Sequence, residues 1–197
     1  SAVVAQLTVA VGTSATVTMG LQGRRAGASA NDDLDDWQQA LSFDVSGGTP
    51  PGLTYATASV DTVSGSPDGW TTYQLTATLS AATSNVYTIF GHDSMPLSIP
   101  AAYQVATPFG VDVGGANPAF FASTPEAEYD SWLTVGATDG SAAGAIASTG
   151  IDFASWTESA GLESTNGAVF WMLPDDGPSG SAVVAQLTVA VGTSATV

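Results

Sequence analysis

The sequence predicts an all-β fold, an antiparallel β-sandwich, from three observations. Hydrophobic residues make up 44% of the 197 residues, which is enough to build a core. Alanine, valine, threonine, serine and glycine are abundant, a mixture typical of strands and tight turns. Segments of alternating polar and apolar residues recur along the chain and are separated by clusters of glycine, proline and serine.

The first strand is predicted within a repeat, because residues 1–17 reappear unchanged as residues 181–197. Alternate residues of this segment are apolar, as in a half-buried strand, and a turn at residues 12–14 leads into a second alternation. We expect one sandwich module over residues 1–180 and a second copy of its first strand over residues 181–197. The residues expected to face inward are Val3, Ala5, Leu7, Val9 and Val11, and in the second copy Val183, Ala185, Leu187, Val189 and Val191.

The remaining elements follow from alternation and from the breakers between strands. Five prolines between Met95 and Pro125 predict an irregular excursion. The whole is then an immunoglobulin-like or jelly-roll-like sandwich with a proline-rich excursion and an extending terminal donor strand. Strands are predicted at 37–45, 53–60, 70–79, 86–90, 129–138 and 168–172, and helical turns at 142–148 and 153–159.

Charge is scarce and one-sided, with 18 acidic residues against two basic ones and a net charge of −16. This balance argues against nucleic acid and anionic membranes as partners, since both require lysine and arginine contacts. The apolar stretch at residues 2–11 is too short to span a membrane, and no signal peptide is expected in this chain. Without cysteine, disulfides are excluded. The acidic residues form either a solvated coat or a site for divalent cations.

The densest run of carboxylates marks the candidate metal site. Asp32, Asp33, Asp35 and Asp36 are residue types that suit Ca²⁺, although their spacing does not match an EF-hand loop. The pair that begins at Asp175 is a second candidate. A plain polar loop is the competing interpretation, and no other cofactor is expected.

No enzyme is predicted, because no catalytic constellation accompanies the candidate groups. His92 is the sole histidine and lacks a nucleophile motif, so a structural hydrogen bond is expected for it. Glu126 and Glu128 would be neighbours on one strand, whereas glycoside hydrolysis needs carboxylates opposed across a cleft.

Tryptophans suggest a different function, that of a carbohydrate-binding adhesin module that could depend on calcium. Trp37 and Trp70 open strands beside aspartate-rich loops and are expected to be exposed platforms for sugar stacking. Trp132 and Trp171 lie within apolar segments and are expected in the core. A glycan is therefore considered as a partner.

The terminal repeat predicts self-association through a strand. A strand added to a sheet edge gains main-chain hydrogen bonds, while alternate side chains fill pockets. A head-to-tail contact of this kind does not close on itself and generates an open filament. The chain could be one period of a tandem repeat, a subunit with an appended donor strand, or a chain joined to its neighbour's strand. Which copy pairs within the chain and which pairs between chains is left open.

Three stretches carry a resemblance to known proteins: PLSIPAAYQVATPFGVDVGG from Pro96, EYDSWLTVG from Glu128, and NGAVFWMLPDDGPSGSAVVAQLTV from Asn166. They resemble a recurring segment of large secreted or surface proteins of algae and other aquatic microbes, a group without assigned enzymatic activity. The chain is also similar to pilus-like filaments assembled by donor-strand exchange. The resemblance implies a structural subunit of an extracellular or cell-surface filament, with the protein itself as its partner.

Overall fold

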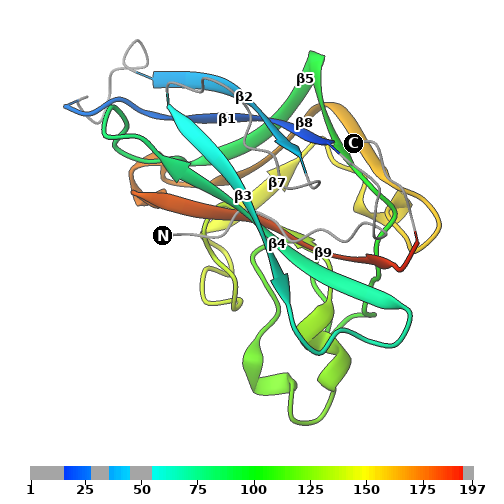
Figure 1. The fold of residues 1–197 in the computed structure, drawn as a ribbon. Coiled ribbons are helices and arrows are strands. Elements are labelled where there is room, and N and C mark those ends of the chain that lie inside the picture. The colour runs from blue at the N-terminus through cyan, green and yellow to red at the C-terminus, as the bar shows by residue number, and fades with distance from the viewer. Residues whose placement is uncertain (1–15, 28–35, 45–54, 193–197) are drawn as a thin grey trace.

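The computed structural model describes residues 16–27, 36–44 and 55–192, which form two antiparallel sheets packed face to face (Figure 1). This arrangement confirms the predicted β-sandwich. One sheet has the strand order β2-β1-β5-β8-β7, and the other has the order β3-β4-β9-β6. The strands are β1 (Thr16–Arg24), β2 (Asp36–Asp44), β3 (Ala56–Val63), β4 (Trp70–Leu79), β5 (Thr88–Ile99), β6 (Trp132–Leu133), β7 (Ile146–Thr149), β8 (Leu162–Trp171) and β9 (Ser181–Ala190).

A glycine and a tryptophan facing each other fix the pairing of β1 with β2. Gly23 lies opposite Trp37 in the register. A Cβ atom at Gly23 would lie 1.9 Å from the carbonyl oxygen of Asn85 and 2.8 Å from the indole ring. The missing side chain therefore makes room for the indole, which is buried and donates from Nε1 to the carbonyl oxygen of Arg24 at 3.1 Å.

β5 is longer than predicted, because a bulge accommodates its proline. The expected strand ended at residue 90, but β5 continues to Ile99 with a register shift against β8 between His92 and Leu97. Pro96 lies within this interruption, where its lack of an N–H group removes no ladder bond.

The other predicted elements differ mainly in length. β4 is confirmed at residues 70–79, whereas the strand expected at 129–138 is reduced to β6 and the one at 168–172 grows into β8. The helical turn expected at 142–148 gives way to a turn that leads into β7. Within residues 153–159 a short 3-10 helix, η4 (Phe153–Ser155), does form.

The proline-rich excursion forms a third layer against the second sheet. Between β5 and β6 the chain forms the 3-10 helices η2 (Pro118–Phe120) and η3 (Pro125–Tyr129). In Figure 1 these green segments lie below β4 and β9. The main core lies between the two sheets and is built from residues such as Leu21, Leu75 and Leu187. None of the helices in the described ranges is long and apolar enough to cross a membrane.

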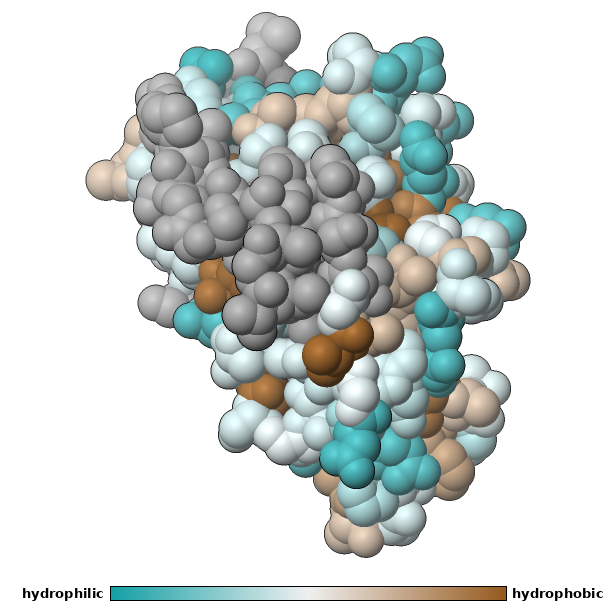
Figure 2. Space-filling view, turned by 45° about the vertical axis from the view of Figure 1, so that its right-hand side comes forward, coloured by the Kyte–Doolittle hydropathy of each residue, from teal (hydrophilic) through white to brown (hydrophobic). Residues whose placement is uncertain are grey.

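Large apolar side chains are rarely exposed in the part of the chain that the structure describes. The surface in Figure 2 accordingly shows hydrophobic colour only in small separate patches among hydrophilic and neutral residues. The exposed large hydrophobic residues are Phe120, Met172, Leu173 and Val191.

The close approach at Gly23 generates a stability prediction. Gly23→Ala should lower the free energy of unfolding by about 1–3 kcal/mol, since the new methyl group forces the Asn85 backbone or the Trp37 ring to move. Chemical denaturation measures the change. Ser59→Ala on the exposed face of β3 is the control and should stay within about 0.5 kcal/mol of wild type. Equal stability of Gly23→Ala and wild type would contradict the proposed packing.

Candidate functional site

The C-terminal copy of the repeat forms β9, a strand in the interior of the second sheet. β9 pairs antiparallel with β4 from Trp70↔Ala190 to Thr78↔Ser181. On its other edge it pairs with β6. We call the space that holds β9, between β4 and residues 131–136, the slot.

The hydrogen bonds on the second edge extend beyond the two residues of β6. Backbone and hydroxyl groups on either side of β6, and one from the excursion, continue the pairing along the strand. They are Thr134 N to Val184 O (2.7 Å), Gly136 N to Val183 O (2.6 Å), Thr188 N to Ser131 Oγ (2.9 Å) and Tyr103 N to Thr188 O (2.6 Å). β9 is therefore held on both edges over most of its length.

β9 is also covered on both faces. Residues 181–189 are all buried. Ala185, Leu187 and Val189 join the core between the sheets. The opposite face carries Gln186 and Thr188, which contact the excursion through the carbonyl oxygens of residues 128–130.

A β-bulge changes the predicted alternation at the start of the strand. The register against β4 shifts between Leu75 and Thr76, which leaves Val184 as the extra residue. Ala182 and Val184 consequently join the core, while Val183 is buried outside the core cluster. The inward assignment of Val183 is corrected for this reason.

The predicted inward orientation is also wrong beyond the end of β9. Val191 is 63% exposed, because β9 ends at Ala190 and Val191 N donates to the carbonyl oxygen of Gly69 in a turn. Its inward assignment is corrected as well. Val3, Ala5, Leu7, Val9 and Val11 in the N-terminal copy lie outside the described residues.

The loop Pro174–Gly180 leads the chain from β8 into the slot and is fixed at several points. Asn85 Nδ2 donates to the carbonyl oxygen of Pro174 at 2.7 Å, and Val86 N donates to that of Pro178 at 3.0 Å. Leu79 N donates to the carbonyl oxygen of Gly180 at 2.8 Å, which sets the first residue of β9 against the end of β4.

A buried arginine ties this loop to the hairpin of β1 and β2. Nε of Arg24 lies 3.6 Å from a carboxylate oxygen of Asp36 and 3.6 Å from one of Asp175. The other carboxylate oxygen of Asp36 accepts from Gln22 and from the Tyr87 hydroxyl at 3.0 and 2.6 Å. Burial, together with Asp36, raises the pKa of Tyr87, so this phenol stays protonated and donates.

The candidate calcium residues divide between this cluster and the part of the chain that is not described. Asp36 and Asp175 are both ion-paired with Arg24, a cation that competes with any metal for their oxygens. Asp32, Asp33 and Asp35 lie outside the described residues. Within the described ranges, no group of three or more His, Cys, Asp or Glu residues is placed to hold a metal ion.

Asp130 is a fully buried carboxyl group beside the slot. Its side chain accepts hydrogen bonds from Val105 N at 2.8 Å and Val111 N at 2.6 Å, while its carbonyl oxygen accepts from Gln186 of β9. Burial raises the pKa of Asp130 to about 7, with a smaller contribution from the nearby carboxylate of Asp112, against the lowering effect of the backbone donors. Asp130 thus joins the excursion to the strand.

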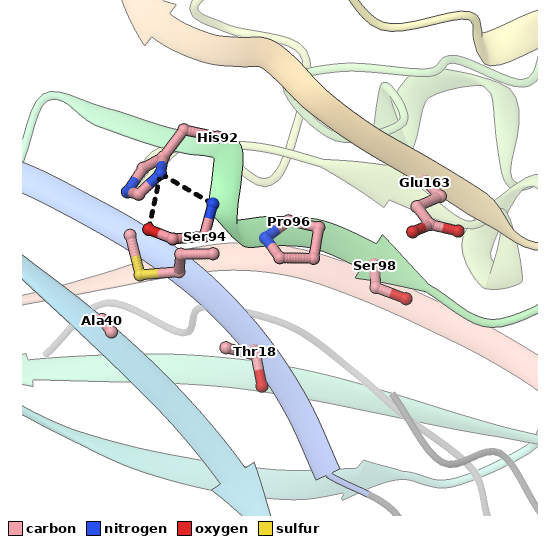
Figure 3. Close-up of a pocket in the computed structure, with 8 residues that line it drawn as sticks. Thr18, Ala40, His92, Ser94, Pro96, Ser98 and Glu163 are labelled. Atoms are coloured by element: carbon pink, nitrogen blue, oxygen red, sulfur yellow. Dashed lines mark hydrogen bonds between the residues drawn. The ribbon is translucent and has the colours of Figure 1, made fainter.

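His92 lies at one end of a surface pocket of about 560 Å³ (Figure 3). Its Nδ1 contacts Ser94 N at 3.3 Å and Ser94 Oγ at 3.1 Å, and its ring stacks on Phe90. Glu163 lies at the other end of the pocket. Both of these hydrogen-bonding contacts come from one neighbour in the bulge, Ser94. The arrangement is a local turn contact.

The other candidate groups lie apart from one another. Trp37 is only 1% exposed and stacks on Tyr55, so its expected role as an exposed sugar platform is wrong. Trp70 is half-buried and packs against Tyr103. Glu126 and Glu128 are in η3, a 3-10 helix rather than a strand. Trp132 is buried, as expected, and Trp171 packs against the core.

Three contributors to the site were missed from the sequence: Val184, Asp130 and the hydrogen-bonding role of Gln186 with Thr188. Gln186 and Thr188 are polar residues within an apolar strand, and this pattern could have indicated buried hydrogen-bonding partners, because buried polar groups are hydrogen-bonded. The bulge at Val184 and the burial of Asp130 had no local signal.

Comparison of the chain with protein-family models, with curated proteins and with solved structures finds no match.

The buried carboxyl group generates a prediction about pH. The pKa of Asp130 is raised in the folded protein from 3.8 to about 7, so its contribution to stability is fully present below about pH 4 and is lost as the pH rises to about 7. The difference in unfolding free energy between wild type and Asp130→Asn should therefore fall as pH rises, by up to about 1.4 kcal/mol per pH unit. Urea denaturation at several pH values measures it.

The exposed residue Asp139 supplies the control for this measurement. Hydrogen bonds from Ser141 lower the pKa of Asp139, so its contribution is complete above about pH 4. The difference between wild type and Asp139→Asn should stay constant from pH 5 to 7. If the difference for Asp130→Asn is also constant over this range, the raised pKa of the buried Asp130 carboxyl group is contradicted.

Proposed function

We propose that this chain is a structural module of an extracellular filament whose modules are joined by strand donation. Each module would contribute one slot and one strand of sequence SAVVAQLTVA, which fills the slot of a neighbouring module. The observation that carries the proposal is the environment of β9. A strand buried on both faces and paired on both edges has the same sequence as residues 1–10.

Withdrawing β9 would have a large cost, and this supports a tight junction. The slot would lose the side chains of Ala185, Leu187 and Val189 from the core, each of the larger two contributing about 1.5–3 kcal/mol when buried. It would also expose the hydrogen-bonding edges of β4 and residues 131–136. An empty slot therefore favours any strand of the same sequence, whichever chain supplies it.

The absence of charge on the repeated segment suits it to joining acidic modules. Residues 1–17 and 181–197 contain no Asp, Glu, Lys or Arg, although the chain carries a net charge of −16. The whole side-chain charge thus lies on residues 18–180, and an uncharged strand enters the slot without like-charge repulsion. The repulsion between modules is long-ranged and screened by salt, so junctions should form faster at higher ionic strength.

Two connectivities would give such a filament, a tandem repeat and separate subunits. In a tandem repeat, residues 181–190 would be the first strand of the following module, and residues 1–10 would fill the slot of the preceding one. In separate subunits, residues 1–10 of one chain would enter the slot of another in place of that chain's own residues 181–190. Both give an open head-to-tail filament. The resemblance of three motifs to segments of secreted and surface proteins supports an extracellular location.

Opening the slot in the full chain tests the proposal. Leu187→Asp places a carboxylate in the core, which should expel residues 181–190 and leave the slot free for residues 1–10 of another chain. The single variant should form filaments that electron microscopy detects, with one module per step. The variant that combines Leu7→Asp with Leu187→Asp should form none, because both copies are then excluded.

Val191→Asp is the matched control for this experiment. The residue is exposed beyond the end of β9, so the same type of change should leave the slot filled and the protein free of filaments. Filaments in the combined variant, or none from Leu187→Asp alone, would overturn the proposal.

A further inference from the structure

The polar face of β9 makes more specific contacts than its core face. Gln186 is 4% exposed, and its Nε2 donates to the carbonyl oxygens of Glu128 and Asp130, both at 2.8 Å. Its Oε1 accepts from Gln74 Nε2 of β4 at 3.2 Å. The Gln186 side chain therefore connects β9 to β4 and to the segment of residues 128–130.

Thr188 repeats this arrangement two residues further along. The residue is fully buried, and its Oγ1 is hydrogen-bonded to the carbonyl oxygen of Tyr129 at 2.6 Å and to Oγ1 of Thr72 at 2.8 Å. Thr72 in turn is hydrogen-bonded to Ser66, which holds the turn before β4. The partners of Gln186 and Thr188 all lie on two elements that flank β9, namely β4 and the segment of residues 128–130.

The apolar residues of β9 determine which face of the strand is turned to the core, but they distinguish registers two residues apart by packing alone. A shift by one residue would place the polar residues in the core, which is costly. At the positions of Ala185, Leu187 and Val189, a shift by two residues keeps the faces and exchanges only Ala, Val and Leu for one another along the core side. Such exchanges cost packing free energy where Ala and Leu replace each other, but they leave no buried polar group without a partner.

The polar face, in contrast, does not tolerate a shift by two. Either Val184 or Thr188 would then take the place of Gln186. Valine donates no hydrogen bond, and the single hydroxyl hydrogen of threonine serves one of the two carbonyl oxygens. Buried carbonyl groups without donors are costly, so the register with Gln186 and Thr188 in place is favoured.

We propose that Gln186 and Thr188 are the residues that fix the register of the strand in the slot. Gln6 and Thr8 hold the same places in the N-terminal copy. This inference rests on the proposed function and extends to the partner. The slot selects a second copy of this chain because its strand is uncharged and has glutamine at its sixth position and threonine at its eighth.

Cysteine cross-linking in the full chain measures the register, because the protein has no cysteine of its own. Thr78 lies opposite Ser181, so Thr78→Cys with Ser181→Cys reports the observed register. Thr78→Cys with Val183→Cys reports a shift by two residues. The two yields are compared under the same oxidant in otherwise wild-type protein and in a Gln186→Met, Thr188→Val background, which keeps side-chain volume while removing the hydrogen bonds.

The ratio of shifted to observed cross-link should rise at least about tenfold in that background, the factor that about 1.4 kcal/mol gives. Leu21→Ala on β1 of the facing sheet is the control, since it removes core packing but neither a polar contact nor a residue of β9. It should lower the unfolding midpoint and leave the ratio within about twofold of wild type. If the protein with both polar substitutions fails to fold, Gln186→Met and Thr188→Val are tested singly. A ratio unchanged by the polar substitutions would overturn the inference.

A second arm tests the intermolecular case separately. In the Leu187→Asp chain, adding Gln6→Met and Thr8→Val should reduce filament growth at least about tenfold for the same reason. Undiminished growth would contradict selection of the partner by these residues. If Leu187→Asp alone forms no filaments, the proposed function fails, while the intramolecular cross-link ratio still decides whether Gln186 and Thr188 set the register.

Discussion

The two-sided pairing and two-sided burial of β9 is the constraint on which the rest of this structure depends. A strand buried in this way must find partners for its backbone groups on both edges, because water does not reach them. β4 supplies one edge, and residues 131–136 with Tyr103 supply the other. The excursion packs where it does because the outer face of β9 offers it hydrogen-bonding side chains.

The two faces of β9 make different contributions to its place in the sheet. The core face contributes free energy through burial of aliphatic side chains, which is non-directional. The outer face contributes direction, because Gln186 and Thr188 donate hydrogen bonds to particular carbonyl oxygens. In the proposed filament, a strand that joins two modules would need both contributions, one to hold the junction and the other to set the step between modules.

Charge is arranged so that it does not interfere with this strand. The repeated segments are uncharged, and the buried cation of the described residues, Arg24, pairs with Asp36 and Asp175 at the start of the path into the slot. An ion pair there stabilises the loop through which the chain reaches β9. The acidic side chains remain for solvation, and in the proposed filament they would oppose contacts between modules other than the uncharged strand in the slot.

Several features of this protein could be predicted from its sequence alone because they are local. The all-β class follows from composition and alternation, β4 follows from a clean polar and apolar pattern, and the identity of the two terminal copies is evident by inspection. The inward face from Ala185 to Val189 also follows, since the period of two holds wherever a strand is regular.

Tertiary structure decided the features that depend on distant partners. The bulge at Val184 reflects the mismatch with β4, and the passage of β5 through Pro96 depends on a gap in its pairing with β8. Trp37 is buried because Gly23, a residue of another strand, leaves it space. Asp130 is buried because its backbone donors come from residues 105 and 111. Such contacts join residues far apart in the chain, so no local pattern of residues encodes them.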